Sequence, residues 1–120
     1  MTREEFDQLC SEQPGVILSG PGELDAWKVG GKMFACFGRQ EDRAGNTETG
    51  AVKCPDVEMA EMLIDAGAAR KAPYFPLPWV LLTFADLTTD EARRRIEVSY
   101  DLIRASLTKK AQAALPKREV

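Results

Sequence analysis

The chain has 120 residues, of which 44% are hydrophobic and 29% are charged, and this balance is typical of a single globular domain. No apolar run approaches the roughly 18 residues that a membrane-spanning helix requires, and the acidic, amphipathic N-terminal stretch does not resemble a secretory signal. We therefore expect one domain over residues 1–120, located in the cytoplasm. The sequence has no histidine, which excludes a His-based catalytic triad and removes the commonest metal ligand.

The three cysteines, Cys10, Cys36 and Cys54, are widely spaced and form no C-x-x-C pair. Their odd number and their spacing disfavour a disulfide framework or a zinc site. All three lie among apolar residues, so we expect buried free thiols. The sequence predicts no metal site and no cofactor.

The first predicted element is a helix that begins at Thr2 and ends at Pro14-Gly15. Thr2 and Glu5 have the spacing of a capping box, in which each side chain accepts a hydrogen bond from a free backbone N–H of the first turn. The apolar residues at helical spacing then form the inward face, which carries Phe6, Leu9 and Cys10. A short strand over residues 16–18 follows.

The stretch "AWKVGGKMFACF" (residues 26–37) predicts a β-hairpin, because Gly30 and Gly31 can both take the positive φ that a two-residue turn requires. Counted outward from this turn, each strand alternates between the two faces of the sheet. One face is expected to carry Trp27, Val29, Phe34 and Cys36, with Lys32 at its end. The other face is expected to carry Lys28, Met33, Ala35 and Phe37.

Residues 38–50 are polar and bounded by glycine, which predicts a long loop between strands. Residues 51–54 resume the sheet, with Lys53 pointing away from the core. A second helix begins at Pro55-Asp56 and ends at Gly67, where glycine is a typical cap. Its core positions are Ala60, Leu63 and Ile64.

Prolines in the stretch 73–78 predict a turn or an edge segment, because proline cannot donate to a strand ladder. The run from Trp79 to Phe84 is the strongest strand pattern in the chain. Its inner face is expected to carry Val80, Leu82 and Phe84, and its outer face Trp79, Leu81 and Thr83.

The last helix begins at Thr88, which forms a second capping-box pattern with Glu91. Its apolar stripe consists of Ala92, Ile96, Ser99, Tyr100, Ile103 and Leu107. Three helices with one apolar stripe each, combined with tight turns between neighbouring strands, predict an α+β fold. We expect a two-layer sandwich in which the helices cover one face of a mainly antiparallel sheet.

The uncovered face of this sheet is expected to present Lys28, Lys53 and Trp79 together, beside Met33 and Leu81. Two cations next to an aromatic ring suit an anionic, planar partner, and single-stranded nucleic acid is bound in this way. The alternative is an ordinary solvent-facing sheet whose lysines serve solubility. The apolar residues of this face exceed what solubility needs and favour a contact with a protein or a small ligand.

The order of "WKVGGKMFA", "VKC" with a following proline, an aromatic-proline segment before "WV", "SYDLI" and "LTKK" resembles the MmcQ/YjbR family, from Met1 to about Lys110. The resemblance implies an α-β(3)-α-β(2)-α arrangement. The family's biochemical function is not established, and its members are often labelled DNA-binding. Many members carry a His and an Asn-Lys pair before the tryptophan, whereas "YFPLPW" has neither. The positions that match the family's pattern, and therefore inherit a role in binding, are Lys28, Lys32, Lys53, Trp79, Ser99 and Tyr100.

DNA binding through a second surface is the alternative function. Residues 91–120 hold 8 basic and 4 acidic residues, which is a local charge of +4. Because the net charge of the chain is −3, residues 1–90 together carry −7. The candidate contacts are Arg39 and Arg43 in the predicted loop and Arg93 and Arg94 in the last helix. The acidic net charge of the whole chain disfavours nucleic acid as a partner.

The sequence contains no catalytic constellation. Ser99 lies on a core stripe, and no histidine can activate it. The "VGGK" stretch lacks the spacing of a phosphate-binding loop. The sequence thus favours a non-enzymatic binding or interaction module, monomeric or homodimeric, whose partner is an unidentified small ligand or protein.

Overall fold

The computed structural model describes residues 1–21, 25–37, 49–73 and 75–117. Within these ranges the helices are α1 (Arg3–Ser11), α2 (Val57–Asp65), α3 (Thr89–Ala105) and α4 (Lys109–Ala113), with a 3-10 turn over Phe84–Asp86. The strands are β1 (Val16–Leu18), β2 (Ala26–Val29), β3 (Lys32–Phe37), β4 (Thr49–Lys53), β5 (Arg70–Lys71) and β6 (Trp79–Thr83). Most of the predicted loop over residues 38–50 lies outside the described residues, and its last two positions belong to β4 instead.

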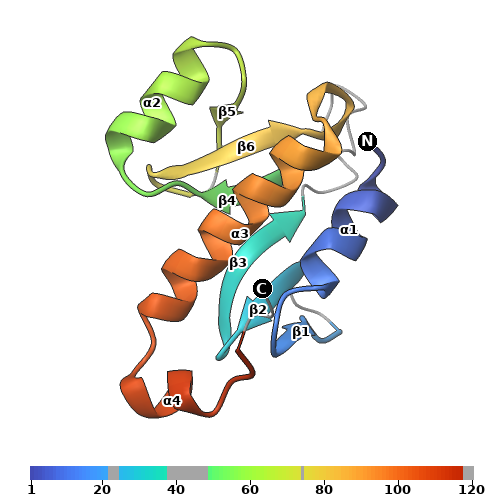
Figure 1. Ribbon diagram of the computed structural model, residues 1–120. Coiled ribbons are helices and arrows are strands. Elements are labelled where there is room, and N and C mark those ends of the chain that lie inside the picture. The colour runs from blue at the N-terminus through green and yellow to red at the C-terminus, as the bar shows by residue number, and fades with distance from the viewer. Residues whose placement is uncertain (22–24, 38–48, 74, 118–120) are drawn as a thin grey trace.

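The strands form a six-stranded sheet in the order β1-β2-β3-β4-β6-β5, and each neighbouring pair is antiparallel. Figure 1 shows α1 and α3 lying side by side over this sheet, while α2 lies beside β5 and β6. The predicted α+β sandwich is therefore confirmed. Elements that the sequence did not predict are β5, the 3-10 turn and α4.

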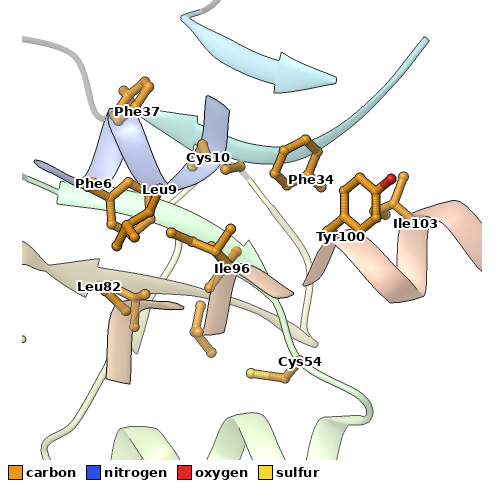
Figure 2. Packing of buried hydrophobic residues seen from close by; sticks show 14 of the residues in the cluster. Phe6, Leu9, Cys10, Phe34, Phe37, Cys54, Leu82, Ile96, Tyr100 and Ile103 are labelled. Atoms are coloured by element: carbon orange, nitrogen blue, oxygen red, sulfur yellow. The ribbon is translucent and has the colours of Figure 1, made fainter. Parts of the chain in front are cut away.

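One hydrophobic core joins the helices to the face of the sheet that they cover. Phe6 from α1, Ala60 from α2 and Ile96 from α3 all belong to it (Figure 2). The rings of Phe6 and Phe84 stack with their centroids 4.5 Å apart, directly over Gly50, where an added Cβ would lie 3.0 Å from the Phe84 ring. A side chain at residue 50 would therefore disturb the centre of the core.

The helix caps agree with the spacing of the sequence. Thr2 and Glu5 form both halves of a capping box, as predicted. Thr88 accepts from the backbone N–H of Glu91, but the Glu91 carboxylate is bonded to Arg95 at 3.2 Å rather than to the cap. The second capping box is therefore only half formed.

A β-bulge in β3 changes which residues of this strand face the core. Trp27 pairs with Ala35, whereas the next residue of β2, Lys28, pairs with Met33, so Phe34 is the additional residue. Ala35 and Phe37 consequently join Phe34 in the core beneath the helices, and Cys36 faces the opposite side. The prediction was wrong for Ala35, Cys36 and Phe37, because strict alternation does not hold across a bulge.

The C-terminal segment packs against the turns at one end of the sheet. Leu107 lies so close to Gly30 that a Cβ there would come within 2.5 Å of the leucine side chain, and Leu115 contacts Gly15 in the same manner. The Tyr100 hydroxyl donates to the carbonyl of Pro14 at 2.5 Å. Arg104 donates to the Tyr100 hydroxyl and to the carbonyl of Pro116. These contacts hold α3 and the segment after it against the start of β1.

Candidate binding face of the sheet

The face of the sheet opposite the helices, called the open face below, carries one row of side chains that crosses five strands. Ile17 pairs with Lys28, Lys28 with Met33, and Lys53 with Trp79. In the adjacent row, which faces the helices, Trp27 pairs with Ala35, Ala35 with Val52, and Val52 with Val80. The ladder between β3 and β4 ends at Ala35 and Val52, so Met33 and Lys53 lie on the same face of neighbouring strands without being direct partners. At the usual strand spacing the row is about 19 Å long.

This row alternates between apolar and cationic side chains. Ile17 of β1, Met33 of β3 and Trp79 of β6 alternate with Lys28 of β2 and Lys53 of β4. The register thus brings Lys28, Lys53 and Trp79 to one face, as strand alternation predicted. Whether these side chains bind a partner remains a prediction.

The open face also has a small apolar cluster of its own. Four small residues are almost inaccessible to solvent there, namely Ala26, Cys36, Ala51 and Ala72. Met33, Phe75, Trp79 and Leu81 pack over them. The rings of Phe75 and Trp79 are stacked, with centroids 5.0 Å apart and an interplanar angle of 29°. The open face therefore presents a half-buried aromatic pair above a tightly packed floor.

The charge of the sheet is entirely positive. None of the six strands, as the structure defines them, contains Asp or Glu. Arg70 of β5 pairs with Leu81, and its Nη2 donates to the Thr83 hydroxyl at 3.0 Å, so it belongs to the same face as Lys28 and Lys53. The open face thus carries three cationic side chains of the strands, in a protein whose net charge is −3.

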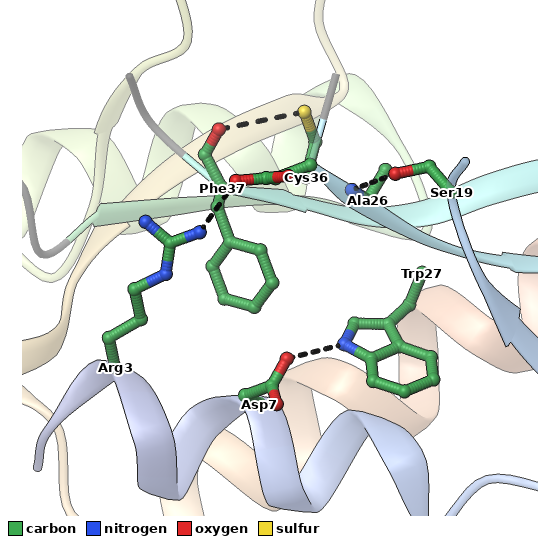
Figure 3. Close-up of polar contacts among 8 residues, drawn as sticks. Arg3, Asp7, Ser19, Ala26, Trp27, Cys36 and Phe37 are labelled. Atoms are coloured by element: carbon green, nitrogen blue, oxygen red, sulfur yellow. Dashed lines mark hydrogen bonds and ion pairs between the residues drawn. The ribbon is translucent and has the colours of Figure 1, made fainter. Parts of the chain in front are cut away.

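Trp27 lies on the other side of the sheet, against α1. Its indole N–H donates to the Asp7 carboxylate at 2.9 Å (Figure 3). In the same layer the Arg3 guanidinium lies 4.4 Å from the centroid of the Phe37 ring and pairs with Asp25. The two tryptophans therefore lie on opposite faces of the sheet. Trp79 packs against the cluster of the open face and also against the core beneath the helices, so it reports on the open face but not on that face alone.

Lys32 lies at the end of the hairpin and pairs with Val29, a residue of the helix-covered core. Its strand position belongs to the helix side, although its side chain is exposed at the turn. It therefore does not extend the row formed by Lys28 and Lys53.

Ser99 lies in the core, where its hydroxyl forms hydrogen bonds with backbone groups of β3 and β4 beside the bulge. Its hydroxyl donates to the carbonyl of Phe34 at 2.6 Å and accepts from the backbone N–H of Lys53 at 2.9 Å. These groups lie just beyond the last paired residues of β3 and β4, Ala35 and Val52. The hydroxyl thus replaces a ladder hydrogen bond that the bulge prevents.

Tyr100 is also in the core, with its ring edge-on to Phe34 and its hydroxyl bonded to Pro14 and Arg104. Ser99 and Tyr100 are 0% and 1% exposed, so neither side chain reaches the open face. The contacts of both residues are structural.

Arg93 and Arg94 are exposed on α3, among carboxylates. Arg93 is 3.8 Å from Asp90, and Arg95 is 3.2 Å from Glu91. A shallow hollow on this helix is lined by Arg93 and Arg94 but also by Asp90, Glu91 and Glu97. The other two candidate contacts, Arg39 and Arg43, lie outside the described residues. The part of this surface that is described is therefore of mixed charge.

All three cysteines are buried free thiols, as predicted. Burial raises the pKa of Cys10 far above its usual value, and the nearby Asp7 carboxylate acts in the same direction. Burial likewise raises the pKa of Cys36 and of Cys54. A neutral buried thiol is a poor nucleophile, and within the described residues no three His, Cys, Asp or Glu side chains gather in a way that could hold a metal ion.

Comparison with known proteins shows the family. The sequence model named YjbR matches residues 11–102. The chain belongs to the YjbR family. The crystal structure of the Deinococcus radiodurans protein DR2400, which carries the domain DUF419, is similar to the YjbR fold described above, with a TM-score of 0.75 and 21% sequence identity over 93% of this chain and 86% of the other. No curated protein matches the sequence.

Two residues of the open face of this YjbR domain were missed at the sequence level, Arg70 and Phe75. Arg70 belongs to a strand of two residues, which is too short to give an alternating pattern. Phe75 lies in a proline-rich stretch that was predicted only as a turn or an edge. The aromatic residues beside those prolines were the available signal. In the described part of the chain, no helix has the length and apolar character that a membrane span requires.

Proposed function

We propose that this YjbR-family protein is a non-enzymatic binding module whose open face receives an anionic partner. The observation that carries the proposal is the row Ile17, Lys28, Met33, Lys53 and Trp79, in which apolar and cationic side chains alternate across five strands. Arg70 adds a third cation on the same face. A surface of this kind attracts negative charge while its apolar side chains contact the partner directly.

An ordinary solvent-facing sheet accounts less well for the apolar part of this surface. Met33, Trp79 and Leu81 are half-buried and contiguous, and Phe75 is stacked on Trp79. Lysines that serve only solubility do not require apolar side chains beside them. A contiguous apolar patch beside cations is more typical of an interaction site.

The buried polar groups support a role without catalysis. The hydroxyl of Ser99 already makes two hydrogen bonds within the core. Burial raises the pKa of each of the three thiols and keeps them neutral. An activated nucleophile requires the opposite environment, with a neighbouring base or a lowered pKa.

We also propose that the protein acts in the cytoplasm, because its three thiols are unpaired, as is usual for proteins of reducing compartments. Two copies that met through their open faces would bring like charges together, which disfavours that dimer. We therefore expect a monomer, with the same molar mass by light scattering at low and high protein concentration.

The test uses Trp79 as the reporter. The variant Trp27→Phe leaves Trp79 as the single tryptophan of the chain, which has two. This variant is titrated with three polyanions, namely polyglutamate, heparin and a single-stranded oligonucleotide. We expect at least one of them to change the emission of Trp79, and we expect Lys53→Gln to weaken that binding.

The matched control is Arg94→Gln, which removes one positive charge from the opposite side of the molecule, on α3. The proposal requires that this variant bind like the parent. If no polyanion changes the emission of Trp79, or if Arg94→Gln and Lys53→Gln weaken binding equally, the open face is not the binding surface.

A further inference from the structure

We propose that the partner of the open face is a single strand of nucleic acid that lies across the strands of the sheet. The inference rests on the proposed function and identifies the chemical class of the partner. It depends on three properties of the open face, namely the length of its row of side chains, the spacing of its cations and its stacked aromatic pair.

The shape of the open face favours a polymer over a small molecule. Small ligands bind mainly in concave sites that bury most of their surface. Two shallow hollows of the described surface lie on α3 and between α1 and the start of α3, and residues of the open face line neither of them. A row of side chains about 19 Å long suits a chain-like partner that makes repeated contacts along its length.

The spacing of the cations suits a phosphate backbone. Lys28 lies on β2, Lys53 on β4 and Arg70 on β5, and these strands are the second, fourth and sixth in the sheet. Neighbouring cations are therefore separated by about 10 Å across the sheet. Among the residues that the structure describes, the six strands contain no Asp or Glu, and the carboxylate of Asp25 lies just before β2, near Cys36.

The aromatic pair distinguishes a nucleic acid from an acidic peptide. An acidic peptide gains from the cations, but its carboxylates gain nothing from the stacked rings of Phe75 and Trp79. Nucleobases stack on aromatic rings whatever their sequence. A duplex keeps its bases stacked on each other and cannot offer them to the rings, so the partner is single-stranded.

The experiment measures the affinity of the Trp27→Phe variant for a thymidine oligonucleotide of about 12 nucleotides, by the quenching of Trp79, at several salt concentrations. Three cations that each neutralise one phosphate give a slope of log K against log salt of about −2 for a single strand. Lys53→Gln and Lys28→Gln should each make that slope shallower by about 0.7. The control variant Arg94→Gln should leave it unchanged.

Removal of the ring tests the stacking contribution. Trp79→Leu should lower the affinity by roughly tenfold or more, followed by the anisotropy of a labelled oligonucleotide. If this substitution unfolds the protein, the salt dependence of Lys28→Gln and Lys53→Gln decides instead, since both lysines are on the surface of the sheet. A duplex of the same length should compete poorly with the single strand.

Each outcome decides between the inference and the proposed function. If polyglutamate or heparin changes the emission of Trp79 but the oligonucleotide does not, the inference is wrong and the proposed function stands. Equal binding of duplex and single strand overturns the inference as well. If none of the polyanions changes the emission of Trp79, both fail.

Discussion

At the scale of single residues, Ser99 is a buried polar residue that fixes the backbone of two strands of the open face. Its hydroxyl joins the bulge in β3 to the backbone of Lys53. The bulge places Phe34, Ala35 and Phe37 in the core, and the Ser99 hydroxyl satisfies the backbone groups that the bulge leaves unpaired. A family-matching residue can thus shape the open face without being part of it.

Ser99→Ala should destabilise the protein by about 1–3 kcal/mol, because it leaves the Phe34 carbonyl and the Lys53 N–H buried without this partner. Denaturant unfolding of the purified variant measures the change. The control is Ser106→Ala, which removes a hydroxyl bonded to Ile103 at the exposed end of α3. Its effect should stay within about 0.5 kcal/mol. Equal effects of the two substitutions would contradict the role assigned to Ser99.

The buried thiols give the stability of the protein a pH dependence. The pKa of each thiol is raised by burial in the folded state, so the unfolded chain loses these protons first. Their contribution to stability is therefore complete below the unfolded pKa of about 8.5 and is lost as the pH rises above it, by up to about 1.4 kcal/mol per pH unit for each thiol. Denaturant unfolding between neutral and alkaline pH should show this fall. Cys10→Ala should show a shallower fall, and an unchanged slope would contradict the assignment.

At the scale of the elements, the hairpin between β2 and β3 is fixed by its turn and by the chain that packs against it. Gly30 and Gly31 both have positive φ, 58° and 82°. Leu107 packs on Gly30, whereas nothing lies within 4 Å of a Cβ at Gly31. The two glycines therefore share a backbone requirement but differ in their surroundings.

Gly31→Ala should destabilise the protein by about 1 kcal/mol, since alanine is strained at positive φ. Gly30→Ala should cost about 1 kcal/mol more, because its new Cβ also displaces Leu107. Thermal and denaturant unfolding of both variants measure the difference. Equal losses would show that Leu107 yields without cost and that the C-terminal segment does not restrain the hairpin.

The elements also show which structural features the sequence can predict. The caps of α1 and α2, the glycine turn and the inward face of β6 follow from local spacing, and the structure agrees with each of them. The bulge at Phe34 does not follow from local spacing, because it depends on how β3 meets β2, β4 and Ser99. The short strand β5 exists only through its pairing with Val80 and Leu81.

The same distinction applies to the candidate site. Lys28, Lys53 and Trp79 lie on strands with regular alternation, so counting residues was sufficient to place them on one face. Cys36 lies beyond the bulge, and counting assigned it to the wrong face. Arg70 and Phe75 join the site through tertiary pairing and stacking, which a local pattern does not reveal.

At the scale of the whole molecule, charge is separated between the two layers. The strands hold basic residues and no acidic ones, while α3 carries Asp90, Glu91, Glu97 and Asp101 among its arginines. The net charge of −3 therefore conceals a sheet whose own charge is positive. Local charge decides where a polyanion can approach, and net charge sets only the long-range background.

The central claim is that the open face, and not the surface of α3, is the binding surface. It is tested most directly by backbone amide chemical shifts recorded while the oligonucleotide or polyglutamate is added to the intact protein. The account predicts that the largest changes fall on Lys28, Met33, Lys53 and the indole of Trp79. Changes confined to Arg93, Arg94 and their neighbours on α3, with the open face unaffected, would contradict it.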